Sequence, residues 1–229
     1  MSMEFKNKNI ESLTFPKELV SVLSGFNNKI LSSLENDGTP IESGIFSIGK
    51  LEGDDLFVYT IFIWCTSINE IIDSLNLVIN DLISLPDNYL KWSGAPETRI
   101  YLLVRTYFNE FFRSREVFTE ILHGLKSQGK LTKEEVKSIK SSYHIAVEGM
   151  IATRNRFVHS SPGWKGKDHF DLVLVEANRE KGMSLASEEI RDILNNNCQR
   201  FIPIFYSEGM RMRDLMQKFM NDMVLTLRN

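Results

Sequence analysis

The chain has 229 residues, of which 42% are hydrophobic and 25% charged, as in an ordinary soluble globular protein. Its formal net charge of −3 excludes a uniformly basic surface, so nucleic acid would have to bind a local basic patch. The two cysteines, Cys65 and Cys198, are too few for a disulfide framework, and we expect reduced thiols in or near the core. Residues 1–9 lack an apolar signal core, which predicts a cytoplasmic protein.

The chain is predicted to begin with a loosely held N-terminus, because residues 1–14 are mostly polar. A helix follows, since Pro16 suits a first helical turn and apolar residues recur at helical spacing as far as Leu34. Residues 45–48 and 56–57 flank a Glu-Gly-Asp-Asp sequence. This stretch is compatible with a small hairpin or with a loop.

The most apolar stretch, residues 56–68, is too short and too closely followed by polar residues to be a membrane span. It instead predicts a buried helix that continues to Leu85 and is closed by Pro86. Glu70 and Asp73 lie three residues apart on this helix. They are candidates for pairing with Arg154 or for orienting a catalytic histidine, and the alternative is that they form the solvated side of the helix.

A third helix is predicted from Glu97 to Ser127, after a loop over residues 87–96. Apolar residues cover one side of it, four arginines decorate it, and Gly129 stops it. The sequence Thr132-x-x-Glu135 is a capping box, which predicts the start of a fourth helix.

The fourth helix has an apolar stripe at spacings of three and four, formed by Val136, Ile139, Tyr143, Val147 and Met150. The next position on the stripe is Arg154, so a guanidinium falls where a core side chain is expected. Because a buried and unpaired charge is costly, Arg154 requires a carboxylate, a neighbouring subunit or an anionic ligand.

The remaining chain is predicted to contain a loop after Pro162-Gly163, a short strand at residues 172–175, and a last helix from Ser187 to Leu227. Pro203 is expected to kink or break this last helix. Four or five long helices with ordinary connections predict an all-α helical bundle over residues 15–229, with a small hairpin or short strands as additions.

Arg154, Asn155 and His159 are the residues that point to chemistry. Five helical steps place His159 about 140° around from Arg154, so the two converge only if the helix frays or two copies of it meet. Gly149 permits close approach of another backbone one turn earlier. The structural alternative is that Arg154 pairs with a buried acid and that the helix dipole favours His159 at the C-terminal end.

An arginine and a histidine without a metal suit cleavage of RNA by its own 2′-hydroxyl. The histidine can take or give a proton near neutral pH, and the guanidinium can stabilise the negative charge of the transition state. The sequence has no Gly-rich phosphate loop and no His-Glu-x-x-His motif, and the other histidines (His123, His144 and His169) do not cluster with cysteines or acids. We therefore expect no metal and no cofactor.

The string Arg154-Asn155-x-x-x-His159, late in a helix of an all-helical chain, resembles the signature of the HEPN superfamily. That signature is an arginine, a polar residue directly after it, and a histidine four to six residues beyond the arginine. The resemblance implies a metal-independent endoribonuclease that dimerises, so that two motifs form one composite site. Arg154 and His159 would then be catalytic, with Asn155 as the positioning residue.

The same resemblance implies roles and partners, and it leaves an alternative open. Many members of the superfamily are toxins or antiviral defence effectors, so a cognate inhibitor protein is a possible partner. Others are inactive, and the alternative is a non-catalytic module that binds nucleotide, RNA or a protein. Residues 149–169 carry four Lys or Arg against one acid, which makes Arg156, Lys165 and Lys167 candidates for binding RNA phosphates.

Overall fold

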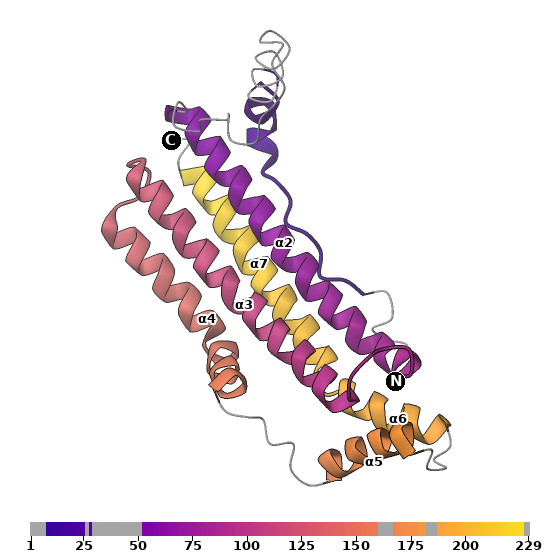
Figure 1. The fold of residues 1–229 in the computed structure, drawn as a ribbon. Helices are drawn as coiled ribbons and strands as arrows, with labels where there is room; N and C mark the ends of the chain where they lie inside the picture. Colours follow the sequence, from indigo (N-terminus) through magenta and orange to yellow (C-terminus); the bar gives the residue numbers. More distant parts are fainter. Residues whose placement is uncertain (1–7, 26–27, 29–51, 160–166, 182–186, 227–229) are drawn as a thin grey trace, which may run out of the picture.

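The computed structural model describes residues 8–25, 28, 52–159, 167–181 and 187–226. Over these residues the protein is an all-α bundle, which confirms the predicted fold class (Figure 1). Among the described residues, the 3-10 helix η1 (Lys17–Leu19) leads directly into helical residues 20–25. The α-helices with both ends described are α2 (Gly53–Asn88), α3 (Pro96–Ser127), α4 (Lys133–His159), α5 (Lys167–Lys181), α6 (Ser187–Cys198) and α7 (Ile202–Thr226).

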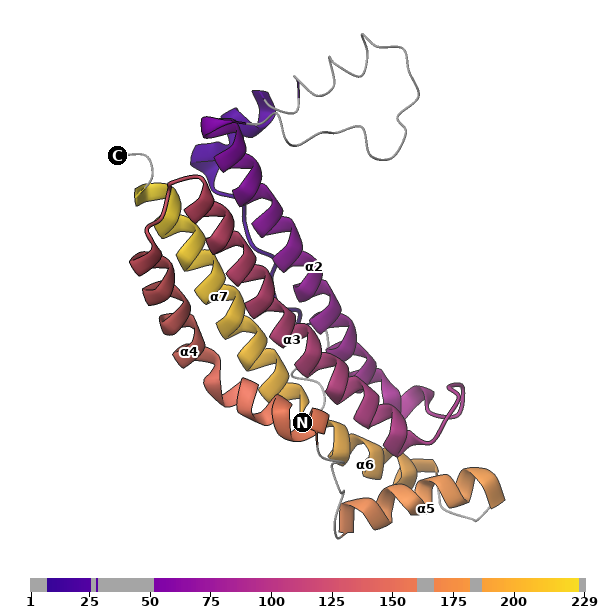
Figure 2. The same ribbon diagram turned by 60° about the vertical axis from the view of Figure 1, so that its left-hand side comes forward.

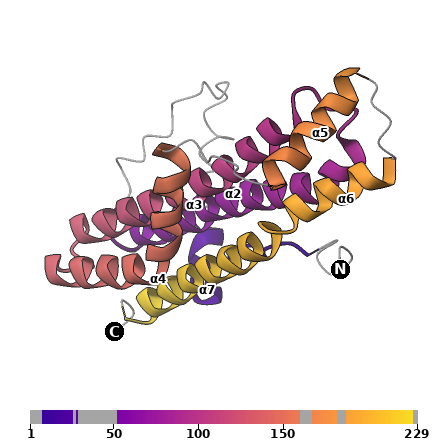
Figure 3. The ribbon, with the colours of Figure 1, turned by 90° about the horizontal axis from the view of Figure 1, so that it is seen from below.

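Helices α2, α3, α4 and α7 run lengthwise beside one another, and the shorter α5 and α6 lie together at one end of the bundle (Figures 1 and 2). Helix α3 packs between α2 and α4, while α2 also contacts α6 and α7. The view from below shows α5 and α6 beyond the end of α7 (Figure 3). Helix α4 is therefore an outer helix, held mainly by α3.

Aromatic side chains join the helices in one hydrophobic core. The ring of Tyr107 on α3 stacks on that of Phe205 on α7, with centroids 3.7 Å apart. Phe118 of α3 lies 5.4 Å from Trp64 of α2 and 5.0 Å from Tyr143 of α4. Each such buried side chain contributes about 1.5–3 kcal/mol to the stability of the fold. Through these ring contacts α3 links α2, α4 and α7.

Helix α2 is the one helix among the described residues that is long and apolar enough, by length and composition, to cross a membrane. A core helix that is covered by its neighbours passes the same test. Ile61, Trp64 and Ile68 of α2 are fully buried within the bundle.

The bounds of α2 differ from the prediction at both ends. The helix begins at Gly53, so Leu56 and Phe57 are helical and do not form a hairpin strand. Asp54 and Asp55 in the first turn favour this early start, because carboxylates stabilise the positive end of the helix dipole. Pro86 does not close the helix, which continues to Asn88. Residues 45–48, the other half of the predicted hairpin, lie outside the described residues.

The predicted strand at residues 172–175 is wrong, because these residues lie inside α5. Leu172 and Val175 are buried while Val173 is 44% exposed, so the apolar pair follows the helical spacing of three. The residues after them, Glu176-Ala177-Asn178-Arg179-Glu180, include strong helix formers that extend the helix. A four-residue apolar run does not by itself distinguish a strand from one buried face of a helix.

The expected break in the last helix is confirmed. Helix α6 ends at Cys198 and α7 begins at Ile202, with Pro203 as the second residue of α7. A proline is tolerated there because the first N–H groups of a helix have no intrahelical partner.

Residues 8–14 pack on the bundle, although their polar composition predicts a loosely held segment, and residues 1–7 lie outside the described residues. Ile10 and Leu13 are 2% and 5% exposed, and the segment containing them lies against α2 and α7. Residues 17–25 are helical, as expected, whereas residues 29–34 of the predicted first helix lie outside the described part of the chain.

The start of α4 confirms the capping box. Glu135 accepts hydrogen bonds from the backbone N–H and the hydroxyl of Thr132, at 2.7 and 2.8 Å, and its own N–H donates to Thr132 Oγ1 at 3.2 Å. These bonds to the charged form hold the pKa of Glu135 below its ordinary value of 4.5.

We predict that Glu135→Ala lowers the melting temperature at neutral pH and that this difference from the wild type disappears in acid. A pKa that is lower in the folded state contributes stability above the unfolded-state pKa, and that stability is lost as pH falls through the folded-state pKa. Thermal unfolding from pH 7 to pH 3 measures the difference. Glu134→Ala, at an exposed neighbouring carboxylate in the same turn, is the control and should show a smaller effect at pH 7.

Candidate functional site

The apolar stripe of α4 is buried as predicted and ends one turn before the motif. Val136, Tyr143, Val147 and Met150 are between 1% and 6% exposed. The Tyr143 hydroxyl is 2.8 Å from the hydroxyl of Ser114 on α3, and burial raises the pKa of Tyr143 to about 12. A neutral tyrosine therefore fixes α4 to α3 in the helical turns that precede the candidate site.

The motif residues lie in the last turns of α4. The backbone is helical through His159, so Arg154, Asn155, Arg156 and His159 keep the register of a continuous helix. The side chains of residues 154–159 lie outside the described part of the structure. Arg154 follows Met150 by four residues and thus continues the register of the buried stripe.

The opposite face of α4 is exposed and has little side-chain bulk. Ile145 is 69% exposed, and Gly149 and Ala152 are also exposed. A Cβ atom added to Gly149 would have no heavy atom within 4 Å. At about 100° per residue, this face continues to Arg156 and His159 and lies on the side of α4 opposite Arg154. The open face at Gly149 is therefore the face of the histidine rather than of the arginine.

Helix α4 bends in its second half (Figures 1 and 2). The Thr153 hydroxyl donates a hydrogen bond to the carbonyl of Gly149 at 2.8 Å. A threonine hydroxyl that bonds to the carbonyl four residues earlier favours such a bend. The acceptor residue here is a glycine, which restrains the helical backbone less than other residues do. The bend gives the motif-bearing turns a direction different from that of the part of α4 that packs on α3.

The candidate phosphate-binding residues are separated in the chain. Arg156 lies on α4, and Lys167 is the first residue of α5, although its side chain is outside the described residues. Lys165 lies outside the described residues altogether. The helical backbone thus places Arg156 near the end of one helix and Lys167 at the start of the next.

Glu70 and Asp73 occupy the solvated side of α2, as in the structural alternative. The Glu70 carboxylate lies 3.6 Å from the guanidinium of Arg113 on α3, and its side chain is 70% exposed. Arg113 is therefore an ion-pair partner of Glu70, and the side chain of Arg154, the candidate partner, lies outside the described residues. Sequence position alone does not select among the arginines that could have been the partner.

A shallow groove lies on the outward face of α7. It is lined by Pro203, Tyr206, Ser207, Met210, Arg211, Asp214, Leu215 and Lys218. Arg211 is 3.6 Å from Glu208 and thus partly neutralised. The described lining residues of this groove are all on α7, and the side chains of the motif lie outside the described residues.

A smaller pocket between α3 and α5 is lined by three carboxylates, those of Glu97, Glu176 and Glu180. The Glu176 carboxylate is paired with Arg179 at 2.9 Å. The local excess of negative charge repels phosphate groups, which excludes this pocket as a site for the RNA backbone.

No group of three or more His, Cys, Asp or Glu within the described ranges is placed to hold a metal ion. Cys65 and Cys198 are buried free cysteines, as predicted. Burial raises the pKa of both thiols, that of Cys198 to about 12, so neither is a reactive thiolate at neutral pH.

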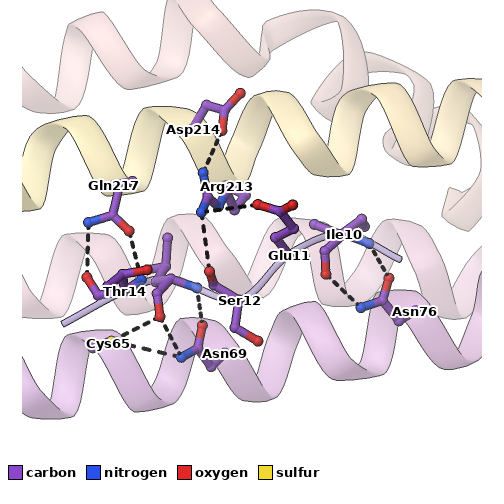
Figure 4. A network of polar contacts seen from close by, with 11 residues as sticks. Ile10, Glu11, Ser12, Thr14, Cys65, Asn69, Asn76, Arg213, Asp214 and Gln217 are labelled. Carbon is purple, nitrogen blue, oxygen red and sulfur yellow. Dashed lines mark hydrogen bonds and ion pairs between the residues drawn. The ribbon is translucent and has the colours of Figure 1, made fainter. Parts of the chain in front are cut away.

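One set of interacting residues was missed from the sequence. Asn69 and Asn76 of α2 and Gln217 of α7 bind the backbone of the N-terminal segment (Figure 4). A signal was present, since Asn69, Asn76 and Asn80 recur at spacings of seven and four and thus share one face of α2.

No family model, curated protein or solved structure matches the chain.

Proposed function

We propose that this protein is a HEPN-like, metal-independent endoribonuclease and that the end of α4 carries its active site. The supporting observation is the position of the motif. The buried stripe of α4 ends at Met150, and the next residue in that register is an arginine, Arg154, in a helix that continues to His159. A positively charged residue at a core-facing position of the helix needs an anion or a partner subunit to compensate its charge.

In the proposed reaction the 2′-hydroxyl of a ribose attacks the adjacent phosphorus, and the bond from phosphorus to the 5′-oxygen breaks. The products are a 2′,3′-cyclic phosphate and a 5′-hydroxyl. His159 takes the proton from the attacking hydroxyl or gives one to the leaving oxygen. Arg154 stabilises the charge that develops on the phosphoryl oxygens, and Asn155 positions the reacting groups.

The proposed substrate contacts follow the local charge. Arg156, Lys165 and Lys167 would hold flanking phosphates, and the carboxylates of Glu97, Glu176 and Glu180 would keep the RNA backbone out of the pocket between α3 and α5. A cytoplasmic role as a toxin or defence effector, restrained by a cognate inhibitor protein, belongs to the same proposal.

The arrangement of α4 supports a composite site in a homodimer. On one helix, Arg154 and His159 lie about 140° apart in register and do not grip one phosphate easily. A second copy that packs on the open face at Ile145, Gly149 and Ala152 would meet the His159 side of the helix. A twofold axis there would bring the two copies of His159 into one cleft, whereas each Arg154 would lie on the bundle side of its own helix.

A non-catalytic binding module remains the second candidate. The groove on α7 favours it, because Tyr206 offers a ring for stacking and Lys218 a positive charge to a ligand. The mutations that follow distinguish the two functions, because binding at α7 does not depend on His159.

We predict that His159→Ala reduces RNA cleavage by the purified protein by roughly 10²–10⁴-fold, because a general acid or base is lost. The measurement is cleavage of a mixed RNA pool, with circular dichroism to establish that the variant is folded. The control is His123→Ala, at an exposed histidine of α3, which should keep full activity. Equal activity of the two variants would rule out His159 as a catalytic residue.

Cleavage is also expected to persist in EDTA and to leave 2′,3′-cyclic phosphate and 5′-hydroxyl ends, since the reaction uses the RNA's own hydroxyl. End-labelling with polynucleotide kinase, together with mass spectrometry of the fragments, identifies these ends. Fragments with 5′-phosphate ends, or activity that returns only with added Mg²⁺, would contradict the mechanism.

A third prediction concerns assembly. Light scattering at micromolar concentration should give about twice the 26.4 kDa chain mass. Ile145→Arg should convert the protein to a monomer and reduce cleavage, because it places a charge on the open face of α4. Leu77→Arg, at a residue of α2 that is 67% exposed, is the matched control and should remain dimeric. A monomeric wild type would rule out the composite site.

A further inference from the structure

Residues 9–14 form an extended segment, here called the N-terminal strap, that lies between α2 and α7 (Figure 4). Ile10 and Leu13 of the strap are buried, whereas Glu11, Ser12 and Thr14 are exposed. The strap thus inserts two apolar side chains three residues apart and leaves the rest of its surface in solvent.

Three side-chain amides bind the backbone of the strap in the same way. Asn76 Oδ1 accepts from the N–H of Ile10 at 2.8 Å, and Asn76 Nδ2 donates to the carbonyl of Ile10 at 2.9 Å. Asn69 makes the same pair with Leu13, at 2.6 and 3.2 Å. Gln217 makes it with Thr14, at 2.8 and 3.0 Å.

A carboxamide carries an acceptor and a donor side by side, which matches the N–H and C=O of one residue in an extended chain. The edge of a β-sheet recognises a peptide by the same pairing. Here the helices supply this pairing through the side chains of Asn69, Asn76 and Gln217. The groove between α2 and α7 that holds the strap, which is distinct from the groove on the outward face of α7, thus binds an extended backbone without being part of a sheet.

The groove also selects side chains. Gly209 of α7 is buried, and a Cβ atom added there would collide with Cδ1 of Ile10. Because Gly209 has no side chain, the side chain of Ile10 can occupy the space beside it. Arg213 adds a hydrogen bond to the carbonyl of Ser12 at 3.3 Å and an ion pair with Glu11 at 3.7 Å.

Most polar partners of the strap are groups that water can reach when the strap leaves, and the exception is the buried thiol of Cys65, which donates to the carbonyl of Leu13 at 3.7 Å. Asn69, Asn76 and Gln217 are only partly buried, so water can replace the strap at each of them. Two fully buried apolar side chains are few compared with any helix of the core, and segments with few buried contacts open below the free energy of global unfolding.

We propose that the groove between α2 and α7 is a binding site for an extended peptide with apolar residues three apart. Its resident ligand is the chain's own strap, and its exchangeable ligand is the same segment of a second copy. The exchange is intermolecular pairing of an identical element, which costs little because the contacts are unchanged. This proposal does not depend on the ribonuclease activity.

The binding test uses the full chain with Ile10→Asp and Leu13→Asp, which releases the strap but leaves every groove residue in place. A fluorescein-labelled peptide of residues 8–16 should bind this variant saturably, as measured by anisotropy, and should bind the wild type at least tenfold more weakly because the resident strap competes. The same peptide methylated at the amide nitrogens of residues 10 and 13 is the matched control. It loses two N–H donors and should bind at least tenfold more weakly than the unmodified peptide.

Equal binding of the two peptides would show apolar adhesion rather than backbone recognition and would overturn the proposal. An absence of binding to a variant that keeps its helical circular dichroism would do the same.

Hydrogen exchange on the wild type decides the matter if the double variant does not fold. The amide hydrogens of Ile10, Leu13 and Thr14 should exchange through a local opening of the strap. The free energy of that opening should depend less on denaturant concentration than the free energy of opening for amides in the cores of α2 and α3. Gly209→Ala should speed exchange at Ile10 at least tenfold. Gly124→Ala, where the nearest atom to the new Cβ is 3.9 Å away, should leave it unchanged. Exchange of the strap only with global unfolding would make it a fixed part of the core.

Discussion

The apolar residues of α2 must be removed from water, and the other elements are arranged so as to cover them. Side chains on almost every turn of this helix are buried, from Phe57 to Leu85. Helices α3, α6 and α7 each cover part of that surface, and the strap covers another part through Ile10 and Leu13. At about 25 cal/mol for each Å² of apolar surface buried, this coverage is the main term opposing the entropy lost on ordering the chain.

Helix α4 stands apart from that arrangement, and this is what makes it suitable for a site. It touches the core through one stripe and through the hydroxyl pair of Tyr143 and Ser114, and its other face is open. Arg154 lies on the same side of the helix as the buried stripe, and His159 lies on the same side as the open face. The two proposed catalytic groups therefore belong to different environments on one helix, the first beside the bundle and the second toward solvent or another subunit.

The sequence predicted those features that arise from local periodicity. The stripes of α3 and α4, the capping box at Thr132 and the break near Pro203 follow from spacing and from single-residue preferences, which act over a few residues. The strand predicted at residues 172–175 failed because a run of four apolar residues has too few positions to reveal its period. The position of the motif on a helix was predictable, whereas the surroundings of its side chains depend on contacts that no local pattern specifies.

Long-range polar contacts were the least predictable part. Glu70 has the charge to pair with any nearby arginine, and packing of α2 on α3 selects Arg113. The polar residues of the strap look like those of a free terminus, because their partners, Arg213 and Gln217, are distant in sequence. Asn69 and Asn76 share one face of α2, but the spacing alone does not reveal that the face binds a peptide backbone.

The bond between Thr14 and Gln217 joins residues 203 positions apart, and this separation has a consequence for biosynthesis. Ribosomes make the strap before α2, and α7 after all the other described helices, so the site that holds the strap exists only once α7 has been translated. Until then α2 lacks part of its cover, and its apolar surface is exposed to other nascent chains and to chaperones. Closure of such a distant contact is slow, so the strap is expected to dock as one of the final steps of folding. A ribosome that stalls before α7 would release a chain whose most apolar helix is still partly uncovered.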